Sequence, residues 1–163
     1  MVMKTRLLKG LALAAALSGW SGALSGRDSA APAESMKQKL IGTWHMVSME
    51  EEGPDGAMTR HTERTGMLIY TADGHVAVQV MYPESEIGAS ANASYQQGGY
   101  EASFGSYEVD EQTHIVTNHY EASLVRTLIG KPLPRVMQFA LDGRFTLRAA
   151  DYREKWSVTW ERY

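Results

Sequence analysis

Residues 67–82, MLIYTADGHVAVQVMY, carry the strongest folding signal in the chain. Two runs of apolar residues, 67–70 and 76–82, lie on either side of Asp73-Gly74. Asp-Gly between such runs is the strongest short-range signal for a β-hairpin, because these residues tolerate the positive φ angles of a tight turn. This stretch therefore predicts two antiparallel strands joined by a short turn.

The same pattern continues in both directions from this hairpin. Asp142-Gly143 again separates two apolar runs, and the last strand alternates Trp156, Val158 and Trp160 with polar residues. The expected strands are residues 40–49, 58–63, 67–70, 76–82, 104–109, 115–120, 136–141, 145–149 and 156–162. Eight or nine strands in sequence order predict an all-β, antiparallel up-and-down β-barrel, because closure of the sheet removes its exposed edges.

Two long segments interrupt this series of strands. Residues 83–99 are polar and too long for a plain hairpin, so we expect a lid, a short helix or disorder there. Residues 124–134 are more apolar, and two interpretations remain open for them. They either cover the mouth of the barrel or plug one of its ends.

The N-terminus has the three parts of a secretory signal peptide. Lys4, Arg6 and Lys9 precede the apolar run 11–17, and Ser21-Gly22-Ala23 is a small-residue cleavage pattern. The alternative is a membrane anchor, but the apolar run is well short of the ~20 residues that a spanning helix needs. We expect a signal peptide at residues 1–23, a flexible leader at 24–35, and a barrel domain at 36–163. The mature protein would be periplasmic or secreted, without a stable membrane anchor.

Composition excludes several classes of function. The chain has 16 Lys and Arg against 19 Asp and Glu, a net charge of −3, so it lacks the cationic excess of a nucleic-acid binder. It contains no cysteine, which excludes disulfides, thiolate nucleophiles and Cys-based zinc sites. No Gly-x-Gly-x-x-Gly motif follows a strand, and the histidine spacing shows no metal set. We therefore expect no cofactor, no metal and no nucleic acid. The oligomeric state stays open.

Several short motifs together resemble a known family, the lipocalin-like domain. They are Leu40-Ile41-Gly42-Thr43-Trp44, the run from Gly66 to Thr71 before Asp73-Gly74, Tyr107-Glu108-Val109-Asp110, His119 with Glu121, and Thr159-Trp160-Glu161-Arg162. The resemblance covers residues 36–163 and implies a barrel with an internal cavity. It also implies that Gly42 and Trp44 close the barrel base and that Arg162 lies over Trp44, which makes these three residues structural.

His119 and Glu121 are the candidates for acid–base chemistry. Alternation places them on one face of their strand with Ile115 and Thr117, and either face of that strand could be the lumen. If the pair faces inward, Glu121 could raise the pKa of His119 into a useful range. The alternatives are a buried pair that sets strand register or a surface pair without consequence.

Two function classes follow. The barrel is expected to bind a small hydrophobic molecule in a cavity lined by Tyr70, Met81, Tyr107, Met137, Phe139 and Trp156. Alternatively, it is a cofactor-independent isomerase, cyclase or hydratase. That enzyme would use His119 and Glu121, with help from Tyr120 or Arg135.

Export can be tested directly on the protein from its source. Removal of residues 1–23 takes away three positive charges and no acidic one, so the net charge falls from −3 to about −6. Intact-mass measurement should give a mature chain that begins between about Ala23 and Ala33. A cytosolic species that begins at Met1 would contradict the prediction.

Overall fold

The sheet closes on itself because its first and last long strands pair with each other. A computed structural model describes residues 34–86 and 95–163. Its elements are α1 (Met36–Leu40), β1 (Gly42–Glu52), β2 (Met58–His61), β3 (Thr65–Tyr70), β4 (His75–Met81), η1 (Glu84–Glu86), β5 (Tyr100–Asp110), β6 (Ile115–Ser123), η2 (Arg126–Leu128), β7 (Pro132–Phe139), β8 (Phe145–Ala149) and β9 (Trp156–Arg162). The expected signal peptide and most of the leader lie outside the described residues, as do residues 87–94 of the expected lid segment.

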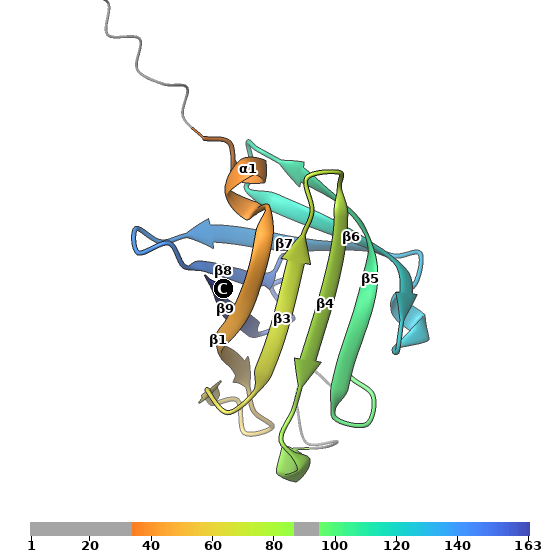
Figure 1. Cartoon of the computed structure of the whole chain (residues 1–163). Coiled ribbons are helices and arrows are strands. Elements are labelled where there is room, and N and C mark those ends of the chain that lie inside the picture. The colour runs from red at the N-terminus through yellow and green to blue at the C-terminus, as the bar shows by residue number, and fades with distance from the viewer. Residues whose placement is uncertain (1–33, 87–94) are drawn as a thin grey trace, which may run out of the picture. The chain divides into compact units, whose positions relative to one another are not determined.

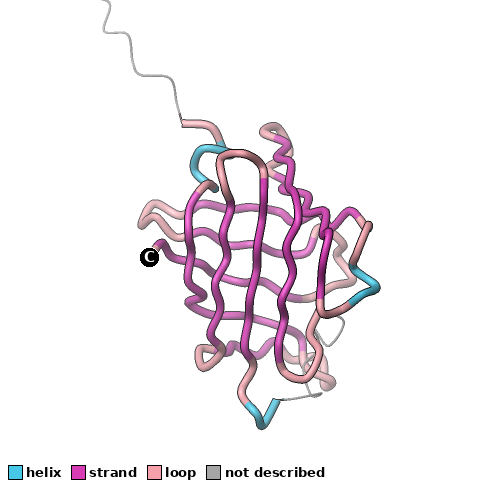
Figure 2. The backbone as a smooth tube through the Cα atoms, turned by 45° about the vertical axis from the view of Figure 1, so that its right-hand side comes forward, coloured by secondary structure: helices cyan, strands magenta, loops and turns pink. Residues whose placement is uncertain are grey.

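Neighbouring strands in the sequence pair antiparallel throughout. The order is β2-β1-β3-β4-β5-β6-β7-β8-β9, and β1 also pairs with β9. Within the described residues, eight strands form the closed ring, and β2 pairs with the second half of β1 as an extra strand. The expected all-β, up-and-down barrel is confirmed. In Figures 1 and 2, β1, β3, β4 and β5 run side by side, and β7, β8 and β9 cross behind them.

The hairpin that carries the strongest sequence signal shows how alternation makes the core. Val76, Val78 and Val80 of β4 point inward and are at most 7% exposed. The residues between them lie on the outer face. Gly74 in the turn has φ +93°, a conformation that costs glycine little. The hairpin is therefore confirmed in its strands and its turn, whereas its inward face is the one opposite to Met81, which was expected to line the cavity.

Helix α1 covers one end of the barrel. Its N-terminus is capped by the Ser35 side chain and by Glu111, whose carboxylate accepts bonds from the backbone N–H groups of Met36 (2.7 Å) and Lys37 (3.0 Å). Leu40 at its end is fully buried. Below it, the Trp44 and Phe145 rings meet edge to face with centroids 4.5 Å apart. This end of the barrel is packed and closed.

Arg162 holds the chain ends together at this closed end. Its guanidinium lies 4.2 Å from the centroid of the Trp44 ring and donates to the carbonyls of Ile41 (3.0 Å) and Lys39 (2.8 Å). A Cβ at Gly42, where φ is +148°, would lie 2.2 Å from the Arg162 guanidinium. The structure thus places Gly42, Trp44 and Arg162 where the resemblance implied.

The segment at residues 124–134 is shorter than expected, because β7 already begins at Pro132. The rest contains η2, in which Leu128 is buried, and Leu124 and Ile129 on either side of this helix are exposed. Within the described residues, none of the helices is long and apolar enough to cross a bilayer.

Arg162→Ala should destabilise the barrel without weakening ligand binding. The substitution removes one ring contact and two charged hydrogen bonds, all partly screened by water, so we expect a loss of about 1–2 kcal/mol. Thermal melting should show a decrease of several degrees. Arg162→Lys should recover little, because an ammonium cannot make the same planar contacts. An unchanged melting temperature in Arg162→Ala would contradict this assignment.

Gly105→Ala should also destabilise the barrel. A Cβ at Gly105 would lie 2.1 Å from the carbonyl oxygen of His119 and 2.8 Å from the backbone nitrogen of Glu121. Strands β5 and β6 would have to separate locally, at a cost of roughly 1–3 kcal/mol. The outward-facing Ser106→Ala serves as the control in the same melting experiment. Equal melting temperatures for the two variants would show that the backbones of β5 and β6 do not approach each other so closely at Gly105.

Candidate functional site

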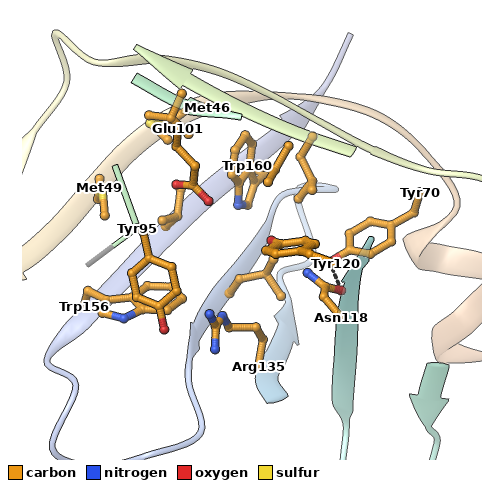
Figure 3. Close-up of a pocket in the computed structure, with 15 residues that line it drawn as sticks. Met46, Met49, Tyr70, Tyr95, Glu101, Asn118, Tyr120, Arg135, Trp156 and Trp160 are labelled. Carbon is orange, nitrogen blue, oxygen red and sulfur yellow. Dashed lines mark hydrogen bonds between the residues drawn. The ribbon is translucent and has the colours of Figure 1, made fainter. Parts of the chain in front are cut away.

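A pocket lies inside the barrel, beyond the aromatic layer of the closed end. Most of its lining is apolar and comes from strands on all sides of the barrel (Figure 3). The lining residues are Met46, Met49, Leu68, Tyr70, Val78, Val80, Tyr95, Glu101, Asn118, Tyr120, Arg135, Leu147, Trp156, Val158 and Trp160. The cavity measures about 60 Å³. Of the described residues that line it, Glu101 and Arg135 are the two charged ones.

Arg135 is buried, and no described carboxylate forms an ion pair with it. Its side chain comes from the inner face of β7, and the residue is 7% exposed. The guanidinium lies between two rings, 5.1 Å from the centroid of Tyr95 and 4.8 Å from that of Trp156. It donates to the carbonyl of Pro134 at 3.0 Å. Within the described residues, no carboxylate oxygen lies within 4.0 Å of it.

The two rings beside Arg135 are held from outside the pocket. Glu154 accepts hydrogen bonds from the Tyr95 hydroxyl at 2.7 Å and from the Trp156 indole N–H at 3.0 Å. Tyr95 and Trp156 also meet edge to face, with centroids 5.9 Å apart. Burial raises the pKa of Tyr95 to about 12, so its hydroxyl stays protonated and donates to Glu154. Glu154 therefore fixes the aromatic frame around the guanidinium.

Glu101 brings a carboxyl group into the pocket from β5. Its side chain is half-buried, and among the described residues it makes no hydrogen bond. Burial raises the pKa of Glu101 to about 7, and the positive charge of Arg135 opposes this rise in part. Both protonation states are consequently populated near neutral pH. The group can donate or accept a hydrogen bond.

The inner wall of the pocket carries further polar atoms. The Tyr70 hydroxyl donates to Asn118 Oδ1 at 3.3 Å, and burial raises the pKa of Tyr70 well above its usual range. Burial likewise raises the pKa of Tyr120, with a further contribution from nearby Glu101. The Trp160 indole N–H is buried without a hydrogen-bond partner among the described residues. The wall thus contains neutral donors, one of them unused.

The ligand-binding residues expected from the sequence separate into three groups. Tyr70 and Trp156 line the pocket. Tyr107 and Met137 are buried in the barrel without lining it, because Tyr107 packs against Tyr70 and donates to the carbonyl of Thr71. The remaining two are corrections: Phe139 stacks on Phe145 at the closed end, and Met81 is 57% exposed on the outer face.

The inward orientation considered for His119 and Glu121 is also corrected. Alternation along β6 buries Val116, Asn118 and Tyr120 and leaves Glu121 exposed on the outer face. His119 is 42% exposed there and pairs with Glu108 across the strands, with Nε2 and Oε1 3.2 Å apart. The sequence offered two possible faces, and packing selects the other one. In the described part of the chain, no three His, Asp or Glu side chains gather into a possible metal site.

Sequence reasoning missed several pocket residues, among them Tyr95, Trp160 and Glu101, and Glu101 is the charged one. Its strand was expected to begin at residue 104, but β5 begins at Tyr100. The face that carries buried Tyr107 also carries Gly105, Ser103 and Glu101, while Phe104 is 56% exposed. Alternation counted back from Tyr107 would have placed Glu101 in the lumen.

Glu101→Gln should change how stability depends on pH. The folded-state pKa of about 7 lies above the ordinary 4.5, so between these values the folded protein binds more protons than the unfolded chain. Its free energy of unfolding should therefore fall as pH rises through this window. Urea denaturation at pH 5 and pH 8 should show a smaller fall in Glu101→Gln. The exposed Glu108→Gln is the control, and a wild-type-like fall in Glu101→Gln would contradict the assignment.

Comparison with protein families agrees with this architecture. A family described as a lipocalin-like domain matches residues 41–163. No curated protein matches the sequence. Among solved structures, the chain is similar to a redesigned β-barrel, with 12% identity and a TM-score of 0.41 over 79% of this chain and 96% of that one. The family match extends over most of the sequence and all nine strands, so the chain belongs to the lipocalin-like domain family.

Proposed function

We propose that this protein binds a small, mainly apolar molecule in the pocket inside its barrel. The observation that carries the proposal is the combination of an apolar interior cavity with polar groups that have no partner in it among the described residues. Binding pockets typically combine a largely apolar lining with a few placed polar groups that orient the ligand. A packed structural core would have no need of Glu101 and Arg135.

The cavity must open to receive a ligand of more than a few atoms. It measures about 60 Å³, whereas pockets for drug-sized ligands span roughly 300–1,000 Å³. Met46 and Met49 line it from β1. Methionine has three rotatable bonds and fills irregular gaps, so Met46 can move aside at low cost. The sulfur of Met49 accepts a hydrogen bond from Arg64 at 3.1 Å, so Met49 is held more firmly. The empty pocket is thus filled in part by its most adaptable residues.

A second candidate function is acid–base catalysis of the isomerase, cyclase or hydratase type in the same pocket. One observation favours it: burial places the pKa of Glu101 near 7, where a carboxyl group serves best as general acid or base. Glu101 would act with Tyr120 or Arg135 in place of the outward-facing His119 and Glu121. Turnover that is lost in Glu101→Gln with ligand affinity kept would establish this function.

We further propose that the protein acts outside the cytoplasm, after removal of its N-terminal segment. The charged and apolar parts of residues 1–23 support export. The net charge of about −6 left after their removal disfavours phosphate-rich partners. The ligand is then a small hydrophobic molecule encountered in the periplasm or the medium.

Occupation of the pocket can be followed by the protein's own fluorescence. Trp156 and Trp160 both line the cavity, so titration with 1-octanol, a neutral apolar probe, should change the tryptophan emission of the mature protein. Val78→Phe fills the cavity and should weaken binding at least tenfold. Ala77→Phe adds the same ring to the outer face of β4 and should leave binding unchanged.

Both variants are first checked by thermal melting, so that loss of binding is read only from folded protein. Calorimetric titration of the wild-type protein provides an independent measurement. If the wild-type protein binds no octanol, or if Val78→Phe binds it equally well, the interior pocket is not the binding site.

A further inference from the structure

The described part of the barrel contains two buried arginines in contrasting surroundings. Arg64 is 3% exposed, and its Nη2 lies 2.6 Å from Oε1 of Glu51, which is also buried. Arg135 is 7% exposed, and among the described residues it lies against two rings and donates to one carbonyl, while the carboxyl of Glu101 in the same pocket interacts with its charge without an ion-pair contact. A buried charge is costly unless it is paired, and ring contacts offset only part of that cost. Arg135 therefore retains unused capacity to bind an anion.

Two other polar groups with unused capacity face the same space. The Trp160 indole N–H is buried without a partner, and the carboxyl of Glu101 accepts no hydrogen bond from the described residues. Figure 3 shows the carboxyl of Glu101 and the indole nitrogen of Trp160 turned toward the interior of the pocket, with the Arg135 guanidinium at its opposite side. A guanidinium and an indole N–H are donors only. The missing partner must accept hydrogen bonds, and its charge must be negative to match Arg135.

We propose that the pocket binds the carboxylate of an apolar organic acid, with Arg135 as its counter-ion and the Trp160 indole N–H as a second donor. This inference rests on the proposed binding function and specifies the class of ligand. A planar guanidinium suits a carboxylate because both can form two parallel hydrogen bonds. The apolar part of the acid would occupy the space lined by Met46, Val78 and Leu147.

Glu101 makes this binding depend on pH. Among residues 34–86 and 95–163, the titratable groups that line the pocket besides Arg135 are Glu101 and the phenols of Tyr70, Tyr95 and Tyr120, and burial keeps these phenols neutral. With its pKa of about 7, Glu101 is protonated at pH 6, where it can donate a hydrogen bond to the ligand. At pH 8 it is ionised and repels the ligand. Affinity for the acid should fall as pH rises.

The test compares three probes of equal chain length with the mature wild-type protein at pH 6. They are octanoate, 1-octanol and octylamine, which differ only in the charge and hydrogen bonding of the head group. Calorimetric titration should show octanoate binding at least tenfold tighter than octanol, in line with a charge-assisted hydrogen bond. Octylamine should bind weakest. This comparison requires no variant to fold.

Variants then test whether Arg135 causes the preference for octanoate over octanol. Arg135→Met keeps the length and removes the charge, so it should bind octanoate and octanol within about twofold of each other. Arg148→Met removes an exposed arginine from the outer face of the adjacent β8 and should keep the wild-type preference, which controls for net charge. Glu101→Gln should make octanoate affinity independent of pH between 6 and 8, where the wild-type protein loses about threefold to tenfold.

The possible outcomes separate the two proposals. If octanol binds and octanoate binds no tighter, or if octylamine binds tightest, the carboxylate assignment is overturned while the binding function stands. If Arg135→Met folds and keeps the tenfold preference, Arg135 is not the counter-ion and the assignment likewise fails. If none of the three probes binds, the proposed function itself fails.

Discussion

Pairing between β1 and β9 is the constraint on which the rest of the molecule depends. Strand β1 pairs with β3 along one edge and with β9 along the other, from Trp44 opposite Arg162 to Glu51 opposite Trp156. This second pairing converts a sheet into a closed ring. Closure removes the free edges, and it also separates the inward side chains of all eight strands from water. Every polar side chain that faces inward must then form hydrogen bonds or ion pairs inside the ring, because burial of an unpaired polar group costs free energy.

The interior divides into two parts that meet this constraint differently. Toward α1, the aromatic rings of Trp44, Phe139 and Phe145 pack against one another. There the Trp44 indole N–H donates to the carbonyl of Leu40 at 2.9 Å, so its polar atom is satisfied. Toward the other end, the indole N–H of Trp160 lies beside a small cavity and has no hydrogen-bond partner in the part of the chain that the structure describes. The first part stabilises the barrel, and the second contains a hydrogen-bond donor without a partner among the described residues.

The position of the polar groups also changes which chemistry the barrel can perform. His119 on the outer face of β6 pairs with Glu108 of β5 in contact with water, and the Glu108 side chain is 74% exposed. The high dielectric constant of water weakens the attraction between such charges. Glu101 and Arg135 lie where burial amplifies electrostatic effects, as the raised pKa of Glu101 shows. Binding of a charged head group, or proton transfer, is therefore far better placed inside the barrel than on its surface.

The sequence by itself determined the architecture and the closed end. Alternation and Asp-Gly turns are local signals, and each reports on backbone conformation that neighbouring residues decide. The arrangement of Gly42, Trp44 and Arg162 was instead implied by the resemblance to the family. The sequence also identified Tyr70 and Trp156 as pocket residues. Only the tertiary structure decided which face of β6 is the lumen, because alternation is symmetric between the two faces and packing against the other strands makes the choice. The convergence of Glu101, Arg135 and Trp160 was likewise beyond the sequence, because these residues lie on three strands that only barrel closure brings around one cavity.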